Sequence, residues 1–131
     1  MKPLSIQSQY NEQARVQTTK TAQIIPPTPL TTTITTLYTA PDQADFLVER
    51  LWIASVAAGA VTYSIYIVPS GGSASVSNAI AYEVSVAAKE FGGVSEQQIF
   101  RMLPGDSLQV EASANTSLNF GGWGYEIQSE T

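Results

Sequence analysis

Apolar and polar residues alternate with a period of two along much of the chain, and this alternation restricts the fold more than any other feature. Residues 61–68, for example, place Val61, Tyr63, Ile65 and Ile67 at every second position. A period of two is that of a β-strand with one buried face, whereas an amphipathic helix repeats every 3.6 residues. The pattern therefore predicts strands rather than helices.

Short segments of this kind follow one another, separated by turn residues. The predicted strands cover residues 32–39, 46–55, 61–68, 80–88, 97–103, 108–113, 117–120 and 123–128. Residues 40–42, 69–73 and 104–106 are built from Pro, Gly, Asp, Ser and Ala, which is typical of turns and loops. Short strands at roughly 8–12-residue spacing favour a β-sandwich, a jelly roll or a barrel. We expect an all-β body of about eight short strands.

The alternation also predicts which side chains share a face. In residues 46–55, one face is expected to hold Leu47, Leu51 and Ile53, and the other Val48, Arg50 and Trp52. In residues 80–88, one face is expected to hold Ile80, Tyr82, Val84 and Val86. Gly121 and Gly122 are predicted to form a turn or bulge between the last two strands.

Residues 51–68 contain no charged residue and approach the minimum length of a membrane-spanning helix. Their second half is rich in Tyr and β-branched residues, which favour strands. Two strands joined by a turn at residues 57–60 are therefore expected, without contact to a membrane.

The N-terminal segment differs from the rest of the chain. Residues 1–39 carry three basic residues and one acidic residue, and Pro26, Pro27 and Pro29 exclude a helix there. Few apolar residues precede Ile24, so the segment could not form a core alone. We expect an extended arm over residues 1–30 that becomes ordered on a neighbouring subunit, followed by the sandwich body over residues 31–131; a floppy tail is the alternative.

The composition excludes several chemistries. The 131 residues include no His and no Cys, which rules out disulfides, thiol nucleophiles, Cys/His zinc sites and a Ser-His-Asp triad. Six basic and eleven acidic residues give a net charge of −5, so the chain as a whole lacks the basic footprint of a nucleic-acid binder. We expect no catalytic residue, no cofactor and no enzymatic activity.

Asp42, Asp45 and Glu49 are close in sequence and could supply oxygen ligands to a hard cation. Their spacing is not that of an EF-hand loop, and no glycine stands where such a loop needs one. We interpret them as a solvated turn followed by a strand, and expect no metal site.

Three aromatic residues are candidates for a contact between subunits: Trp52, Tyr66 and Trp123. Aromatic residues are common in cores and enriched at interfaces, where charged residues are depleted. Exposed Trp and Tyr on a sandwich can also stack on sugar rings, so a carbohydrate-binding module is an alternative.

Three segments resemble, in the same order, small structural proteins of tailed bacteriophages. They are residues 36–41 (TLYTAP), 61–73 (VTYSIYIVPSGGS) and 103–108 (LPGDSL), and the resemblance covers residues 31–128. The family pattern does not include the proline-rich arm.

The resemblance implies a virion protein on the phage capsid surface: a decoration, or cement, protein that binds the major capsid protein and forms a homo-oligomer, with a trimer expected. A protein of the tail, collar or fibre is the alternative. An arm reaching across a subunit boundary would suit a cement protein. Its expected anchors are the apolar residues Ile24, Ile25, Pro26, Pro27 and Leu30, while Arg15 and Lys20 would pair with acidic capsid surface.

Overall fold

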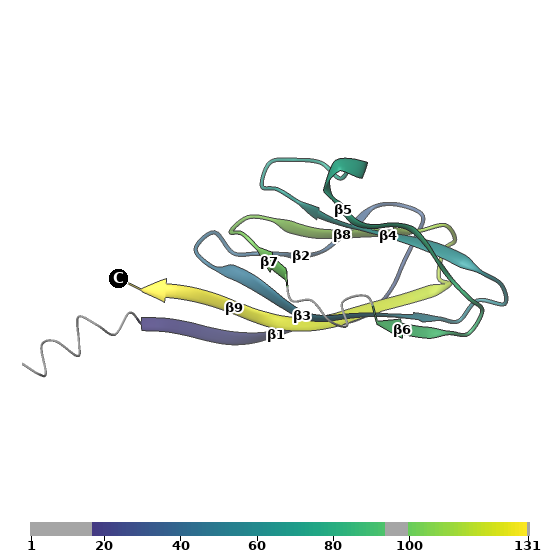
Figure 1. The fold of residues 1–131 in the computed structure, drawn as a ribbon, viewed down its shortest axis with the longest axis horizontal. Coiled ribbons are helices and arrows are strands. Elements are labelled where there is room, and N and C mark those ends of the chain that lie inside the picture. Colours follow the sequence, from purple (N-terminus) through teal and green to yellow (C-terminus); the bar gives the residue numbers. More distant parts are fainter. Residues whose placement is uncertain (1–16, 94–99, 131) are drawn as a thin grey trace, which may run out of the picture.

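Two antiparallel β-sheets pack face to face in the computed structural model, which describes residues 17–93 and 100–130 (Figure 1). The strands are β1 (Gln17–Pro29), β2 (Thr35–Thr39), β3 (Asp45–Ser55), β4 (Val61–Val68), β5 (Ala79–Val86), β6 (Phe91–Gly93), β7 (Phe100–Met102), β8 (Ser107–Ala112) and β9 (Leu118–Glu130), with a 3-10 turn η1 (Val76–Asn78) before β5. One sheet has the order β1-β9-β3-β6, with β7 also paired to β3, and the other has the order β2-β8-β4-β5.

This strand order is that of a double-sheet jelly roll, in which the chain crosses repeatedly between the two sheets. β6 pairs with β3 at Trp52–Ala54 and β7 pairs with β3 at Phe46–Val48, so the two short strands share one position in the sheet. The expected all-β sandwich of about eight strands is therefore confirmed.

The core lies between the sheets. Phe46 and Phe120 come from the five-stranded sheet, Ile65 and Leu108 from the four-stranded sheet, and all four side chains are fully buried. Burial of such side chains contributes about 1.5 to 3 kcal/mol each, which is the main stabilising contribution in a body without disulfides.

A β-bulge in β3 changes the face assignment predicted for this strand. The pairing between β3 and β9 shifts register between Val48 and Arg50, so the strand has one extra residue there. Val48 and Leu51 consequently both face the core, while Leu47 is only partly buried on the other side. The prediction that Leu47 shares a face with Leu51 was wrong, because strict alternation fails across a bulge.

β5 also departs from simple alternation. Val86 is buried, but Ile80, Tyr82 and Val84, which were predicted to share its face, are all exposed. Glu83 has a φ of 50°, and the pairing with β4 shifts register in this region. This irregularity separates the first half of β5, where Ile80 and Tyr82 point away from the core, from the second half, where Val86 is buried.

The last strand runs without a break through its glycines. Gly121 and Gly122 lie inside β9, paired with Trp52 and Leu51, so the predicted turn between two strands is absent. A Cβ at Gly122 would lie 2.3 Å from the Arg50 carbonyl oxygen. These glycines therefore permit close approach of β3, instead of reversing the chain.

The second half of the expected arm belongs to the body. β1 pairs along its length with β9 of the same chain, and Ile25 and Leu30 lie in the core. The domain boundary at residue 30 was therefore misplaced; the first sixteen residues lie outside the described part. Strand pairing uses backbone groups, so a segment poor in apolar residues can still form an edge strand. Pro26 and Pro27 fall where the register shifts.

The uncharged stretch of residues 51–68 forms the end of β3, a loop and β4, as expected. Over the described residues, the structure holds no helix of the length and apolar character needed to span a bilayer.

Candidate interaction surface

The outer face of the five-stranded sheet carries a row of aromatic and aliphatic side chains. Ile24 of β1 lies directly opposite Trp123 of β9, and Ala22 lies opposite Tyr125. Directly opposed residues of an antiparallel pair project from the same face. Ile24 is 75% exposed and Trp123 is 39% exposed.

Trp52 of β3 extends this row. A Cβ at Gly121 would lie 2.3 Å from Cζ2 of Trp52. The Trp52 indole therefore packs directly on the backbone of Gly121, in the space that a side chain there would occupy. The other side of the row is reached by Phe91 of β6, whose ring stacks on Trp52 with centroids 5.9 Å apart and which is 67% exposed. We call Ile24, Trp52, Phe91, Trp123 and Tyr125 the aromatic face.

A hollow of about 350 Å³ opens on the aromatic face. Its lining consists of Ala22, Gln23, Ile24, Ile25, Trp52, Gly122 and Trp123. Apart from the Gln23 amide and the indole nitrogens, these lining side chains are apolar. Exposed apolar patches of this kind mark interaction surfaces on small proteins.

Two basic residues border the aromatic side chains. The Lys20 ammonium lies 4.2 Å from the centroid of the Tyr125 ring, a cation–π contact, and Tyr125 meets Trp123 edge to face at 5.7 Å. Arg50 lies opposite Trp123 in the sheet and is exposed. A third cation, Arg101 of β7, is paired with Asp45 at 3.2 Å.

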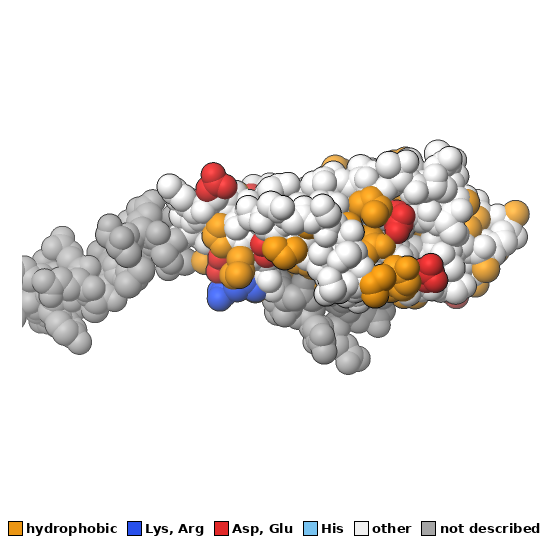
Figure 2. Space-filling view, turned by 90° about the horizontal axis from the view of Figure 1, so that it is seen from above, with side chains coloured by type: hydrophobic (Ala, Val, Ile, Leu, Met, Phe, Trp, Pro, Cys, Tyr) orange, Lys and Arg blue, Asp and Glu red, His pale blue; other side chains and the backbone are white. Residues whose placement is uncertain are grey.

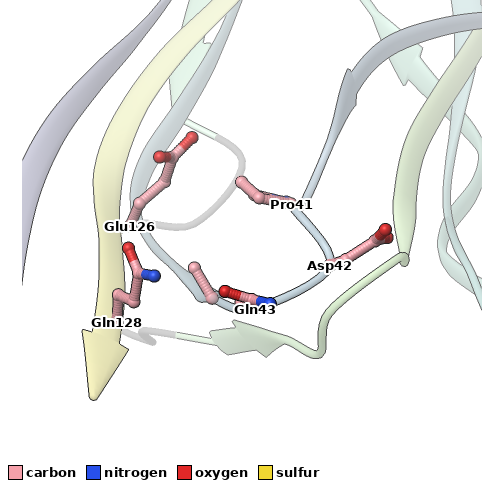
Figure 3. Close-up of a pocket in the computed structure, with 6 residues that line it drawn as sticks. Pro41, Asp42, Gln43, Glu126 and Gln128 are labelled. Carbon is pink, nitrogen blue, oxygen red and sulfur yellow. The ribbon is translucent and has the colours of Figure 1, made fainter. Parts of the chain in front are cut away.

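A second, more polar hollow lies at one end of the sandwich (Figure 3). It has a volume of about 340 Å³ and is lined by the turn between β2 and β3 and by Glu126 and Gln128 of β9. The Asp42 carboxylate points away from Glu126 (Figure 3). Glu126 instead accepts a hydrogen bond from the Tyr38 hydroxyl. The two carboxylates therefore do not form an acid–base pair.

The acidic residues considered as cation ligands do not converge. Asp45 forms the ion pair with Arg101, and Asp42 lies exposed in the turn. Among the residues that the structure describes, no group of three acidic side chains is placed to hold a metal ion.

The structure brings together four of the residues singled out from the sequence: Lys20, Ile24, Trp52 and Trp123 lie on or beside the aromatic face. Ile25 and Leu30 are instead buried core residues, which rules them out as arm anchors. Pro26 and Pro27 are exposed on β1, and Arg15 lies outside the described residues.

Tyr66 does not contribute to the aromatic face. It lies on β4 in the other sheet, is buried, and donates a 2.8 Å hydrogen bond to Glu111. Phe91 was not predicted, because the strand that contains it is only three residues long and has no alternating pattern.

No protein-family model matches the sequence, and no curated protein matches it. Among solved structures, the chain is similar to a protein described under "Bacillus endospore appendages form a novel family of disulfide-linked pili". The identity is 10%, the match covers 89% of this chain and 92% of that one, and the TM-score is 0.56.

A second similarity is to a chain from infectious bursal disease virus strain Gx, with 15% identity and a TM-score of 0.43. It covers 86% of this chain and 32% of the viral one, so the chain spans about a third of that protein. Likeness at such identities concerns the fold alone, and the sandwich that this chain shares with the appendage protein extends over nearly the whole length of both.

Proposed function

We propose that the chain is a non-enzymatic structural protein of a bacteriophage virion, and that it decorates the capsid by binding the major capsid protein. The aromatic face is the observation that carries the structural role in an assembly, while contact with the capsid itself is assigned below to the segment before β1. A folded body that exposes Ile24, Phe91 and Trp123 beside basic side chains has the composition of a protein–protein interface, in which aromatic residues and Arg are enriched.

The resemblance of residues 31–128 to small phage structural proteins supports the virion location. The sandwich shared with a pilus protein supports a structural role in an assembly. Disulfide linkage does not transfer from that protein, since this chain has no cysteine. Contacts between copies of this chain therefore do not include disulfide bonds.

Contact with the capsid is assigned to the segment before β1. Arg15 supplies a basic group for acidic capsid surface, and Lys20 lies at the start of the described part of the chain. Ile25 and Leu30 are committed to the core, so the arm of this proposal ends at residue 16. A homo-oligomer, with a trimer as the form implied by the resemblance, completes the proposal.

Immunogold labelling of particles from the phage that encodes the chain tests the location. Gold over the head is the expected result. Gold over the tail, collar or fibres would replace the decoration role with the tail-associated alternative, and particles without label would overturn the virion assignment.

A binding assay on heads assembled without the chain tests the arm. A chain beginning at Gln17 keeps the nine strands that the structure describes but should bind such heads at least about tenfold more weakly than the full chain. Arg15→Glu should weaken binding in the same direction, with Lys89→Glu as the control of equal charge. Equal occupancy by the truncated and full chains would remove the arm from the proposal.

Carbohydrate binding is the second candidate, since Trp52 and Trp123 line one hollow. Sugars need several hydrogen-bonding partners besides a stacking surface, and the largely apolar lining favours a protein contact instead. Binding on a glycan array that is lost in Trp123→Ala would reverse this preference.

A further inference from the structure

The outer face of the four-stranded sheet is also apolar and exposed. Ala81 of β5 packs against the core, and side chains alternate along a strand, so Ile80 and Tyr82 point outward. They are 44% and 48% exposed. Viewed onto this side of the molecule, hydrophobic side chains lie next to acidic ones (Figure 2).

The charges on this sheet have one sign. Within its four described strands, the charged residues are Glu83 of β5 and Glu111 of β8. Glu83 is exposed, and its backbone N–H donates a 2.9 Å hydrogen bond to Oγ of Ser64, which holds the irregular part of β5 against β4. We call Ile80, Tyr82, Glu83 and Glu111 the acidic face.

The acidic face and the aromatic face complement each other in charge and in polarity. The aromatic face presents Lys20 and Arg50 beside apolar side chains, and the acidic face presents Glu83 beside Ile80 and Tyr82. The two faces lie on opposite sides of the sandwich, so one molecule cannot bring them together (Figure 1). A second copy of the chain can.

We propose that the aromatic face of one copy binds the acidic face of a second copy. Tyr82 of the second copy enters the hollow between Ile24, Trp52 and Trp123, where its ring packs against the two indoles. Arg50 pairs with Glu83. Because copies of a chain with net charge −5 repel each other, opposite charges at the contact select this orientation over others.

The contact joins two different surfaces and is therefore heterologous. Such a contact closes into a ring when the rotation between copies divides a full turn, and otherwise propagates as an open stack. Both a trimer and a stack can use it. The inference rests on the proposed function and deepens it by naming the partner of the aromatic face. Self-association is measured on the purified chain without phage particles. A chain that does not self-associate would therefore overturn this inference without overturning the virion assignment.

Charge reversals test the pairing by sedimentation equilibrium. Arg50→Glu alone and Glu83→Arg alone should each weaken self-association about tenfold or more. An equal mixture of these two variants should associate more strongly than either variant alone, with copies of the two variants alternating, because every contact between them brings opposite charges together. The double variant Arg50→Glu/Glu83→Arg should associate more strongly than either single variant, since the opposite charges again meet.

Control variants place the same charge changes elsewhere. Lys89→Glu and Asp42→Arg alter exposed residues outside both faces and should leave association unchanged. Tyr82→Ser should weaken association, and high salt should weaken that of the wild type. A wild type that stays monomeric, or a loss of association in Arg50→Glu that is absent in Glu83→Arg, would overturn the proposal.

Discussion

The hydroxyl of Tyr38 on β2 donates a hydrogen bond to the carboxylate of Glu126 on β9, and the two residues thereby connect the two sheets of the sandwich. The Tyr38 ring also packs against Phe46 of β3, with centroids 4.3 Å apart. One side chain therefore contributes an apolar contact to the core and a charged hydrogen bond at its margin.

Tyr38→Phe should lower the free energy of unfolding by about 1 kcal/mol. The substitution keeps the ring contact with Phe46 but removes the hydrogen-bond donor to a partly buried carboxylate. Hydrogen bonds to charged groups contribute about 1.5 to 3 kcal/mol to stability, and the partial exposure of this pair lowers that contribution. Urea unfolding followed by Trp fluorescence measures the change.

Tyr125→Phe is the matched control for that substitution. It removes a phenol hydroxyl from the same body while the ring contacts with Trp123 and Lys20 remain. An equal loss of stability in the two variants would show that the bond to Glu126 contributes nothing specific.

The same pair should make the protein sensitive to alkaline pH. Burial, and then the Glu126 carboxylate, raise the pKa of Tyr38 above its usual value of about 10. Above about pH 10 the unfolded chain loses this proton while the folded protein keeps it, so stability is fully present below that pH and falls as the pH rises.

Unfolding free energies measured between about pH 9 and pH 11 check this expectation. Tyr38→Phe should show a shallower decline than the wild type, although Tyr63, whose pKa burial also raises, still contributes to the decline. Glu126→Gln should fall between the two, because burial is the larger cause of the shift. Identical slopes in all three proteins would contradict the assignment.

Gly122 should not tolerate a side chain. A Cβ there would lie 2.3 Å from the Arg50 carbonyl oxygen and 2.8 Å from Cδ2 of Leu51, so β3 and β9 would have to move apart. Gly122→Ala should cost about 2 to 3 kcal/mol of stability, measured by thermal and urea unfolding.

Gly59→Ala provides the comparison, since a Cβ at Gly59 meets nothing within 4 Å. Its stability should stay within about 0.5 kcal/mol of the wild type. If both alanine variants were equally stable, close approach of the strands would not be the reason for glycine at position 122.

The strands and turns of the body were predictable because their signals are local. The alternation in residues 61–68 matches the bounds of β4, and the turn expected at residues 104–106 contains Gly105 with a φ of 85°. The outward orientation of Leu47 was not predictable, because a bulge shifts the alternation without a mark in the sequence.

Contacts between distant segments were predictable only in part. Trp52 and Trp123 were recognised as candidate interface residues by their chemistry, but the approach of Trp52 to Gly121 depends on strand pairing that no local pattern encodes. The pairing of β1 with β9 was missed for a related reason: its backbone hydrogen bonds require no particular side chains, and the proline-rich composition indicated an isolated arm.

Two neighbouring isoleucines test whether β1 belongs to the folded body. Ile25 is 3% exposed in the core and Ile24 is 75% exposed on the outer face. Ile25→Ala should lower the free energy of unfolding by about 2 to 5 kcal/mol, as expected for truncation of a buried aliphatic side chain, whereas Ile24→Ala should change it by less than about 0.5 kcal/mol.

The measurement is urea unfolding of the full chain at low protein concentration, so that association between copies does not contribute. The adjacent positions share the same strand and the same substitution, which isolates burial as the variable. Similar, small effects at both positions would mean that residues 17–30 are dispensable for the folded body and act as a free arm. A large effect confined to Ile25 would establish β1 as the edge strand that closes the core.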